Sequence, residues 1–542
     1  MTLLRRVQNI WNKPWVLSVL AGVLLGLSFP PFPFPILSFL GIFLILRIVD
    51  LSDSARQAAQ YTWVGFIIWN SIVTYWLLMA SVAAGAAAIL ANAAVMTLPV
   101  MMQKKTADWF DHPWVTGLLQ ACWWVSFEYL HHNWDLAWPW LSLGNAWANV
   151  PQLVQYISAT GYLGISFWVV ATSALAYRLL ADGSQRKSQD ASPALRQTSL
   201  KWGALGMLLL FPAVSLIVNA GLPTPDDGPE NTLTTHVVQP NFDSYQSSGG
   251  HGSPIESNAY IRALSDSLLR GGTELVLWPE NGIHPGLSNV SSEYSMAYYV
   301  EDEIQDFASD RNLTVIGGAT FYEFFNQDEL PPLPEYDEDG LPYLTYNAAM
   351  AFYPGDSIRV YRKHNLVPIV ERMPFARTLA ALDILDLVSW SAIQGYGKGW
   401  EPTLFSVGNT KVPALICYDS IFPNWVRRFV KGGAGLITVI TNDGWWGDTG
   451  GHEQHFAYAR LRAIEFRRFV VRSANNGISG VIGPDGSLHV RTEYWEKDVF
   501  RYEVPIMEDL TFYARFGPWL PWLCLLGGFG SLVWRGVRRF RE

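Results

Sequence analysis

Long apolar runs fill most of the first 220 residues of the chain, and one more lies near its end. They cover residues 15–29, 36–49, 62–80, 83–102, 114–130, 161–181, 202–220 and 516–533. Each run approaches the roughly 20 residues that a helix needs to cross the hydrocarbon core of a bilayer. We therefore predict a polytopic α-helical membrane domain with eight spans, seven within residues 1–222 and the eighth within residues 513–542.

The links between these runs alternate in charge, and this alternation predicts an orientation. Lys and Arg occur before the first run, in the second, fourth and sixth links, and after the last run, whereas the first, third and fifth links carry neither. Because basic links stay on the cytoplasmic side of a membrane, residues 223–512 should lie outside the cytoplasm. The fifth link holds four Trp between residues 134 and 147. These tryptophans predict either an aromatic belt at the membrane interface or a surface on which a catalytic domain or a lipid rests.

Residues 223–512 follow a different pattern. Short apolar stretches that suit buried strands cover residues 234–238, 275–278, 314–318, 357–362, 412–416 and 436–440. Helical periodicity occurs between them at 258–270 and 294–309. Alternating strands and helices predict an α/β layered domain. The arginine-rich stretch 460–472 is predicted to be a solvated or salt-bridged helix, with a contact to lipid headgroups as the alternative.

Three polar residues stand at the ends of predicted strands, and they are Glu280, Lys363 and Cys417. A carboxylate can take the proton of a thiol, an ammonium can stabilise a thiolate and then an oxyanion, and a thiolate can attack a carbonyl. A helix that starts after Cys417 should also favour its thiolate. The alternative for Cys417 is a buried cysteine with a structural role.

Composition narrows the classes of function. The chain has 542 residues, of which 50% are hydrophobic and only 16% are charged, and its 25 Trp suit contact with a membrane interface. The formal net charge of -9 argues against nucleic acid as a partner. Cys122 and Cys524 fall in apolar runs, so no disulfide framework is expected. His452 and His455 are one residue too close for the H-E-x-x-H zinc motif, and we predict neither a metal nor another cofactor.

Several segments resemble a known family. WPEN at 278–281, RKHNLVP at 362–368 and LICYD at 415–419 resemble the three signature segments of the nitrilase superfamily. The run from TNDGWWG to GVIGPDG at 441–486 and the segment WWVSFEYL…WPWLSLGNAW at 123–147 are similar more specifically to the apolipoprotein N-acyltransferase family. The resemblance implies a nitrilase-like α-β-β-α sandwich for the extramembrane domain. It also implies a bacterial inner (cytoplasmic) membrane protein with its catalytic domain on the periplasmic side.

The resemblance implies a reaction as well. A phospholipid would donate an acyl chain to Cys417 as a thioester, and the N-terminal amine of a diacylglyceryl-cysteine lipoprotein would then accept it, in a ping-pong sequence. Glu280 would act as general base and acid, and Lys363 would stabilise the thiolate and the oxyanion. Glu371 and Tyr418 match two further residues of the family's site.

The chain departs from the family at two places. Asp419 stands where Glu is usual, and the Trp of the first strand-to-helix loop is absent, with Phe242 or Tyr245 as candidates to replace it. The alternative function is a membrane-anchored carbon-nitrogen amidase, in which water resolves the same thioester. A transporter or scaffold is a third class, and the complete set of Glu, Lys and Cys argues against it.

Four apolar residues are candidates for contact with lipid substrates, and they are Trp278, Leu382, Leu385 and Trp390. The last three lie in residues 372–400, for which we expect either a packed helix or a mobile lid that touches the bilayer. Glu128 lies near the end of the fifth apolar run. Because a carboxylate that faces lipid is costly, we expect Glu128 to face protein or headgroups.

Overall fold

The structure is a computed structural model, and it describes residues 10–110, 112–185, 193–221, 231–290, 295–355, 357–382 and 395–541. The chain divides into two compact units. The first contains Met1–Trp134, Trp138–Leu222 and Thr511–Glu542, and the second contains Asp135–Ala137 and Pro223–Leu510. The short stretch 135–137 thus belongs with the second unit, although it lies within the first unit's part of the sequence.

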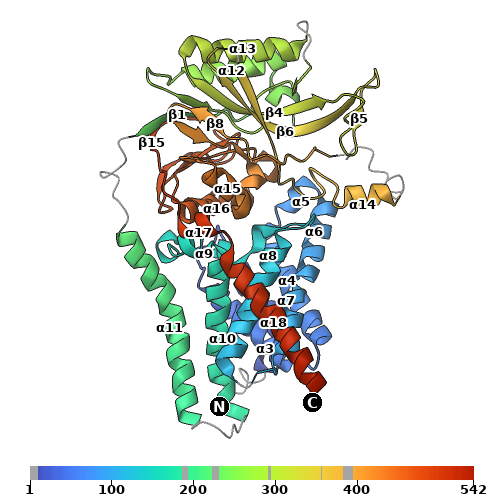
Figure 1. The fold of residues 1–542 in the computed structure, drawn as a ribbon, viewed down its shortest axis with the longest axis vertical. Coiled ribbons are helices and arrows are strands. Elements are labelled where there is room, and N and C mark those ends of the chain that lie inside the picture. Colours follow the sequence, from blue (N-terminus) through green and yellow to red (C-terminus); the bar gives the residue numbers. More distant parts are fainter. Residues whose placement is uncertain are drawn as a thin grey trace. The chain divides into compact units, whose positions relative to one another are not determined.

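The first unit consists of helices (Figure 1). They are α2 (Pro14–Gly26), α3 (Leu37–Leu51), α4 (Ala55–Thr74), α5 (Leu77–Ala80), α6 (Val82–Val95), α7 (Thr97–Thr106), α8 (Pro113–His131), α9 (Ile157–Thr160), α10 (Leu163–Gln185), α11 (Pro193–Ala220), α17 (Phe512–Phe516) and α18 (Trp519–Arg541). Short polar side chains explain some of the helix starts. Ser54 and Ser81 accept hydrogen bonds from the backbone N–H groups of Gln57 and Ala84, as N-cap residues do.

Four helical segments among the described residues are long and apolar enough to cross a membrane. They are Val82–Thr106, Leu163–Leu180, Thr198–Ala220 and Trp519–Arg538. The expectation of eight spans is therefore supported only in part. Helices α2 and α3 have 13 and 15 residues, which is short for a span, and α4 and α8 carry more polar residues along their lengths. An apolar run does not fix where a helix begins or ends, because α4 covers Ala55–Thr74 whereas its run covers residues 62–80.

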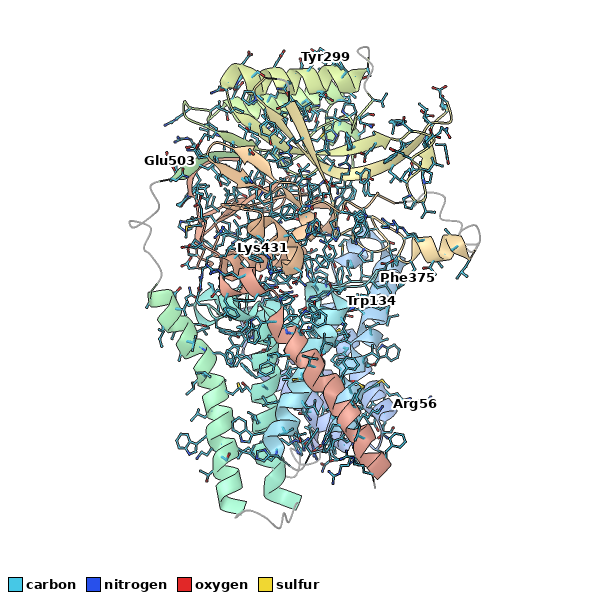
Figure 2. All side chains as sticks on the ribbon, in the orientation of Figure 1. Arg56, Trp134, Tyr299, Phe375, Lys431 and Glu503 are labelled. Atoms are coloured by element: carbon cyan, nitrogen blue, oxygen red, sulfur yellow. The ribbon has the colours of Figure 1, made fainter. Side chains whose placement is uncertain are left out.

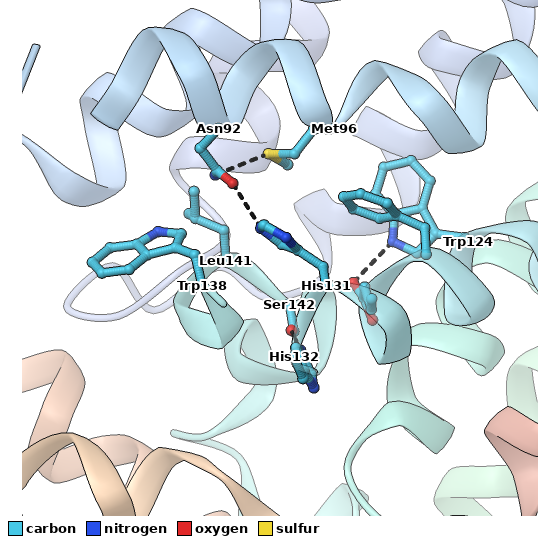
Figure 3. A pocket seen from close by; sticks show the side chains of 10 residues that line it. Asn92, Met96, Trp124, His131, His132, Trp138, Leu141 and Ser142 are labelled. Atoms are coloured by element: carbon cyan, nitrogen blue, oxygen red, sulfur yellow. Dashed lines mark hydrogen bonds between the residues drawn. The ribbon is translucent and has the colours of Figure 1, made fainter. Parts of the chain in front are cut away.

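A buried carboxylate in the first unit is bound by protein through one of its oxygens. Glu128 of α8 is 4% exposed, and its Oε1 accepts hydrogen bonds from Trp124 Nε1 and Leu143 N, both at 2.9 Å. This burial confirms that Glu128 faces protein. Glu128 lines a small pocket in which His131 Nε2 lies 2.9 Å from Asn92 Oδ1 (Figure 3).

The second unit contains two sheets that pack face to face. The first sheet has the strand order β15-β1-β2-β4-β6-β5, with β3 beside β4 and β7 beside β6, and the second has the order β10-β11-β12-β13-β14. Strand β1 packs against β12, and Ser473 Oγ donates a hydrogen bond to Val238 O across the two sheets at 2.8 Å. The strands are β1 (Thr232–Gln239), β2 (Leu275–Leu277), β3 (Leu287–Ser288), β4 (Thr314–Phe324), β5 (Glu335–Tyr336), β6 (Pro342–Tyr353), β7 (Ser357–Arg362), β10 (Leu415–Ile416), β11 (Ile437–Thr441), β12 (Val470–Ala474), β13 (Gly480–Ile482), β14 (Leu488–Arg491) and β15 (Asp498–Pro505), and β8 (Phe405–Val407) pairs separately with β9 (Thr410–Val412).

Helices cover the outer faces of the two sheets. The pair α12 (Pro254–Asp266) and α13 (Met296–Arg311) packs on the first sheet, and α16 (Gly450–Phe466), with α15 (Pro423–Lys431) against it, packs on the second (Figure 1). Tyr299 marks the outer side of α13, where it is 47% exposed (Figure 2). This order of layers is the predicted nitrilase-like α-β-β-α sandwich. A short helix, α14 (Ala376–Ala381), follows β7.

The arginine-rich stretch differs from its prediction. Helix α16 ends at Phe466, and Arg472 lies in strand β12. Arg462, Arg468 and Arg472 are 2%, 1% and 0% exposed, so a solvated helix over residues 460–472 is wrong, whereas the salt-bridged alternative holds for Arg462 on α16. Their guanidinium groups are paired inside the protein, because Arg468 Nε donates to the backbone carbonyl of Ala434 at 2.9 Å and Arg462 lies 2.7 Å from Glu465.

Candidate active site

The three strand-end residues lie around one buried site. Glu280 follows β2, Lys363 follows β7, and Cys417 follows β10 at the start of the 3-10 helix η7 (Cys417–Ile421). Lys363 Nζ lies 3.4 Å from Glu280 Oε1, and both charges act on the pKa of Cys417. Because β2 and β10 belong to different sheets, packing of the sheets brings the carboxyl ends of these strands together.

Glu280 is held through both carboxylate oxygens. Its Oε1 accepts a hydrogen bond from Asn347 Nδ2 at 2.7 Å, and its Oε2 accepts one from the backbone N–H of Asn442 at 2.9 Å. The neighbouring strand β4 passes so close that a Cβ on Gly318 would lie 2.5 Å from the Cα of Glu280. Only glycine allows this approach of the two backbones. The carboxylate is therefore fixed in position and direction.

Lys363 joins Glu280 to a second carboxylate. Its Nζ donates to Glu371 Oε1 at 2.8 Å, and the residue is 1% exposed. Glu371 also accepts hydrogen bonds from Asn347 Nδ2 at 3.0 Å and from the backbone N–H of Val367 at 2.8 Å. The ammonium group is thus held between two carboxylates that share Asn347 as a donor.

Burial and these charges shift the pKa values in the site. Burial raises the pKa of Glu280, Lys363 opposes this rise, and the charge of Glu371 adds to it. Burial alone would lower the pKa of Lys363, but Glu371 and Glu280 hold that pKa well above its usual value. Lys363 therefore stays protonated, whereas Glu280 binds a proton more readily than an exposed glutamate does. A proton acceptor next to a fixed cation is suited to general acid–base work.

Cys417 is protonated in the resting site. Burial raises the pKa of its thiol, Glu280 adds to the rise, and Lys363 lowers the pKa without outweighing the other two. This corrects the expectation that Lys363 and the helix start hold a resting thiolate. Loss of hydration destabilises the thiolate more than the attraction of these groups stabilises it. The thiol therefore needs a base, and Glu280 is the carboxylate in place to act as one.

Asp419 connects the nucleophile to the segment that carries Lys363. Its Oδ2 accepts a hydrogen bond from the Tyr361 hydroxyl at 2.6 Å, and its Oδ1 accepts from the Asn365 backbone N–H at 2.7 Å and from Asn365 Nδ2 at 3.0 Å. Tyr361 and Asn365 stand two residues before and after Lys363. The buried carboxylate thus fixes the backbone on both sides of the lysine.

Two further residues for which the sequence predicted a role in the site are buried. Tyr418 is 3% exposed, and its ring packs edge-on against Phe422 with the centroids 5.0 Å apart. Trp278 is 0% exposed, and its Nε1 donates to Ser265 Oγ at 2.9 Å within the core between α12 and the first sheet. The expectation that Trp278 contacts substrate is therefore corrected. A Trp that ends a buried strand is explained here by core packing.

The expected lid is described only at its start. Leu382 is 61% exposed, whereas Leu385 and Trp390 lie outside the described residues.

The two candidates to replace the family's missing Trp differ in their exposure. Phe242 is 3% exposed and packs in the core, and Tyr245 is 63% exposed. Of the two, only Tyr245 has a ring surface that another molecule can reach.

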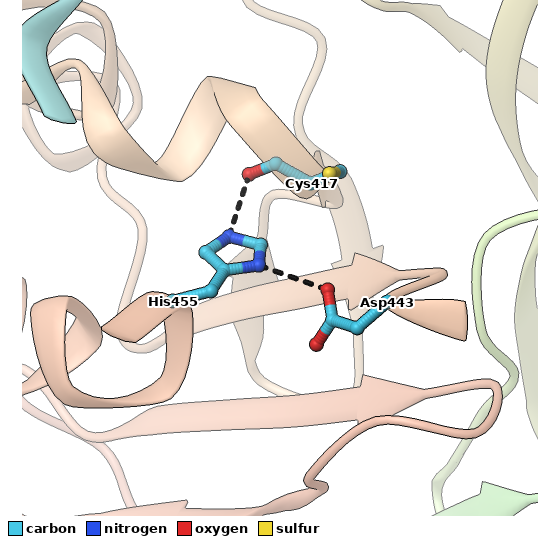
Figure 4. A group of neighbouring side chains, drawn as sticks. All are labelled: Cys417, Asp443 and His455. Atoms are coloured by element: carbon cyan, nitrogen blue, oxygen red, sulfur yellow. Dashed lines mark hydrogen bonds and ion pairs between the residues drawn. The ribbon is translucent and has the colours of Figure 1, made fainter. Parts of the chain in front are cut away.

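Sequence analysis missed a second polar group beside Cys417. Asp443 follows β11, His455 lies in α16 and Arg472 in β12, and each is 0% exposed. Figure 4 shows His455 between the other groups, with its Nδ1 3.0 Å from Asp443 Oδ1 and its Nε2 3.3 Å from the carbonyl oxygen of Cys417. One signal was available, because Asp443 follows the apolar stretch 436–440 just as Cys417 follows its own strand.

These residues do not fit a metal site. The ligand atoms of Cys417, Asp443 and His455 lie within 4.8 Å of one another, a spacing that a metal ion can use. However, Arg472 lies 2.5 Å from Asp443 Oδ2 and 2.9 Å from His455 Nδ1, and its positive charge opposes a second cation. Hydrogen bonds already engage the lone pairs of the carboxylate. The group is better explained as a hydrogen-bonded network.

Two family models match the chain along most of its length. The model for the apolipoprotein N-acyltransferase N-terminal domain matches residues 21–175, and the model for carbon-nitrogen hydrolase matches residues 256–508. The second match contains Glu280, Lys363, Glu371, Cys417 and Asp419, and the network of Asp443, His455 and Arg472.

Curated relatives match both units together. The chain is 28% identical over 549 residues to the apolipoprotein N-acyltransferase of Chlorobaculum tepidum, which covers 97% of each chain. It is 26% identical over 534 residues to that of Geobacter metallireducens, which covers 95% of this chain and 94% of the relative. The solved structure of Saccharomyces cerevisiae Nit3, a member of branch 10 of the nitrilase superfamily, matches with a TM-score of 0.36 and 17% identity over 51% of this chain and 90% of that chain. With one model for each unit and full-length relatives that combine them, the chain is similar along almost its whole length to apolipoprotein N-acyltransferases.

Proposed function

We propose that this protein moves an acyl chain from a phospholipid to the N-terminal amine of a diacylglyceryl-cysteine lipoprotein, through a thioester on Cys417. The observation that supports this most is the pair of buried charges on Glu280 and Lys363 beside the partly exposed Cys417, in a chain that also has helices apolar enough for a membrane. A chain with such helices suits substrates that both carry lipid chains. The names of the curated relatives support the same reaction.

The first half-reaction acylates the sulfur. Glu280 takes the proton of the Cys417 thiol, and the sulfur attacks the ester carbonyl of the phospholipid. Lys363 stabilises the negative charge that develops on the carbonyl oxygen. The ester C–O bond then breaks, and Glu280 returns the proton to the leaving oxygen. A lysophospholipid leaves, and the acyl chain stays on Cys417 as a thioester.

The second half-reaction releases the acyl chain to the amine. The N-terminal amine of the acceptor attacks the thioester carbonyl, Glu280 takes a proton from the amine, and the C–S bond breaks. The proton passes to the sulfur, which restores the thiol and leaves an amide. Because the donor product leaves before the acceptor reacts, the kinetics are ping-pong.

The catalytic unit is proposed to lie on the periplasmic side of the bacterial inner membrane. The alternation of basic and uncharged links supports this orientation. Glu338, which is exposed in the acidic loop before β6, is a suitable position for a reporter cysteine. In intact spheroplasts, a Glu338→Cys variant should react with a membrane-impermeant thiol reagent. Labelling that occurs only after lysis would contradict the orientation.

The reaction itself is tested with purified protein, a phospholipid and a diacylated lipopeptide. Mass spectrometry should show the triacylated lipopeptide and an equal amount of lysophospholipid. A Cys417→Ala variant serves as the control and should give neither product. Release of free fatty acid in place of the triacylated product, with acceptor present, would favour the amidase and overturn the proposal.

A further inference from the structure

The buried network beside Cys417 takes no part in the reaction described above, yet it contacts the nucleophile's backbone. The carbonyl oxygen of Cys417 accepts a hydrogen bond from Ser420 Oγ at 2.7 Å and lies 3.3 Å from His455 Nε2. On its other side, the imidazole meets Asp443 and Arg472, which bind each other at 2.5 Å. A chain of contacts therefore runs from a buried ion pair to the peptide group that follows Cys417.

The contacts of His455 allow the nitrogen that faces Cys417 to act as a donor. His455 Nε2 lies 3.3 Å from the carbonyl oxygen of Cys417 and 3.2 Å from Ser420 Oγ. The carbonyl oxygen has only lone pairs, and the Ser420 hydroxyl already donates to it, so a hydrogen on Nε2 suits both contacts. Nδ1 lies 3.0 Å from Asp443 Oδ1, which can only accept, and 2.9 Å from Arg472, which can only donate, so this side of the ring fits either tautomer. Burial and the charge of Arg472 lower the pKa of His455, which agrees with a neutral ring. The contacts on the Cys417 side therefore favour the tautomer with the hydrogen on Nε2, in which Nδ1 accepts from Arg472.

The backbone of Cys417 needs such a partner. Its φ is +46°, in the left-handed region that residues with a Cβ rarely adopt. Strand β10 ends one residue earlier at Ile416, so its ladder does not fix this residue. Because the peptide group is planar, a partner that fixes the carbonyl of Cys417 also fixes the direction of the next N–H. The direction of the sulfur depends on this same conformation.

We propose that Asp443, His455 and Arg472 form a positioning network that holds Cys417 in its left-handed conformation through a hydrogen bond from His455 Nε2–H. This role deepens the proposed function and rests on it. It differs from a Cys–His–Asp triad, in which the imidazole would take the thiol proton. Here His455 Nε2 is directed at the carbonyl oxygen, and Glu280 remains the base.

Two replacements of His455 separate these roles. Gln keeps an N–H donor at about the position of Nε2, whereas Leu has a similar size and no donor. His452→Gln is the matched control, because His452 lies on the same helix, is 4% exposed and stacks on Tyr494 with centroids 3.9 Å apart, away from Cys417. For each variant we would measure three quantities, which are the rate of Cys417 acylation by phospholipid, the pH dependence of Cys417 alkylation by iodoacetamide, and the melting temperature.

The positioning role predicts a specific order of rates. His455→Leu should slow acylation by about 100-fold, as expected for a misplaced nucleophile, and His455→Gln should recover at least about tenfold of that loss. The midpoint of the alkylation pH profile should stay within about 0.3 units in both variants, since the thiol keeps Glu280 as its base. The control variant should acylate within about twofold of the wild type, because His452 stacks on Tyr494 and is not part of the network, and any loss of packing should appear in the melting temperature instead.

Three outcomes would overturn the inference. A shift of the alkylation midpoint by one unit or more in His455→Gln would identify His455 as a base. Equal acylation rates in His455→Leu and His455→Gln would show that the donor has no role. A loss of acylation in both that is matched by His452→Gln would reduce the network to general stability. Alkylation does not require a lipid donor, so a wild type that fails to acylate would contradict the proposed function without affecting this readout.

Discussion

Two buried ionic groups of similar composition lie next to Cys417, and their charges are arranged differently. In the group of Glu280, Lys363 and Glu371, the ammonium of Lys363 lies 3.4 Å from the Glu280 carboxylate and 2.8 Å from that of Glu371, and the pKa of Glu280 is raised. In the group of Asp443, His455 and Arg472, one guanidinium faces one carboxylate at 2.5 Å. Burial would raise the pKa of Asp443, but Arg472 and His455 hold that pKa far below its usual range.

The difference separates a group that exchanges protons from a group that does not. A carboxylate with a raised pKa can accept and return a proton during a reaction, and Glu280 is such a carboxylate. A carboxylate that is ionised at every physiological pH, such as Asp443, provides only a fixed charge. Burial alone therefore does not identify a catalytic residue, and the direction of the pKa shift distinguishes the two groups.

The largest expected effect is the loss of the acylation rate when Glu280 is replaced. Glu280→Gln keeps the shape of the side chain and removes the base, so acylation of Cys417 should slow by about 1,000-fold or more. Glu280 must be ionised to act as a base, and burial raises its pKa above the usual 4.5. The wild-type rate should therefore fall as the pH is lowered through a value above 4.5. A pH–rate profile of the acylation step measures this limb, and an acid limb that persists unchanged in Glu280→Gln would assign it to another group.

The next effect concerns the stability that Asp443 provides. Asp443→Asn leaves Arg472 without its charge partner in a buried site, which costs about 3–5 kcal/mol and lowers the melting temperature at pH 7 by about 10 °C. Because the folded-state pKa of Asp443 is depressed, its contribution is present above the unfolded-state pKa of about 3.9 and is lost as the pH falls below it. The melting temperatures of wild type and variant should then converge toward pH 3.

The control for this measurement is an exposed ion pair. Asp266 and Arg311 lie 2.8 Å apart with side chains 43% and 31% exposed, so Asp266→Asn should cost less than about 1 kcal/mol. Equal losses in Asp443→Asn and Asp266→Asn at pH 7 would contradict the view of Asp443 as a buried fixed charge.

A smaller effect is expected at Asp419. Asp419→Asn keeps one acceptor oxygen but loses the charge that binds Asn365 and Tyr361 on the two sides of Lys363, so acylation should slow by about 100-fold. Asp419→Glu restores the carboxylate and should retain activity. Both rates can be measured in the same acylation assay. An Asn variant as active as the wild type would show that hydrogen bonds to an uncharged side chain at position 419 are enough to place Lys363.

The smallest expected effect concerns Leu382. A thioester must be shielded from water until the amine arrives. Leu382 is 61% exposed at the start of the expected lid, and Leu382→Gln should raise the ratio of free fatty acid to N-acylated product by about threefold. Leu330→Gln, at a residue that is 50% exposed in the acidic loop, is the control and should leave the ratio unchanged. An unchanged ratio in Leu382→Gln would exclude Leu382 from the shield.

The sequence predicted which residues meet at the candidate site because their local pattern is simple. Glu280, Lys363 and Cys417 each stand at the end of a short apolar strand, and this pattern is visible without knowledge of the tertiary fold. The alternation of strands and helices likewise predicted a layered α/β domain, and the family resemblance predicted the order of its layers. Their mutual distances depend on how two sheets pack, which no local pattern contains.

The residues that were missed have ambiguous local patterns. Arg472 stands in an arginine-rich run that resembles a solvated helix, yet it lies in a central strand and is 0% exposed. Trp278 ends a buried strand, where a tryptophan can pack in the core or face a substrate, and only the hydrogen bond to Ser265 decides for the core. The eight apolar runs also gave no sign of where each helix would stop.

The central claim is that Cys417 carries the acyl chain between donor and acceptor, and one mass measurement tests it directly. Wild-type protein is incubated with phospholipid alone, its mass is recorded, and a diacylated lipopeptide is then added. We predict that the protein gains the mass of one fatty acid less one water, on the peptide that contains Cys417, and that the gain disappears as triacylated lipopeptide forms. An unmodified Cys417 in the presence of donor, together with formation of the triacylated product, would contradict the thioester and the account built on it.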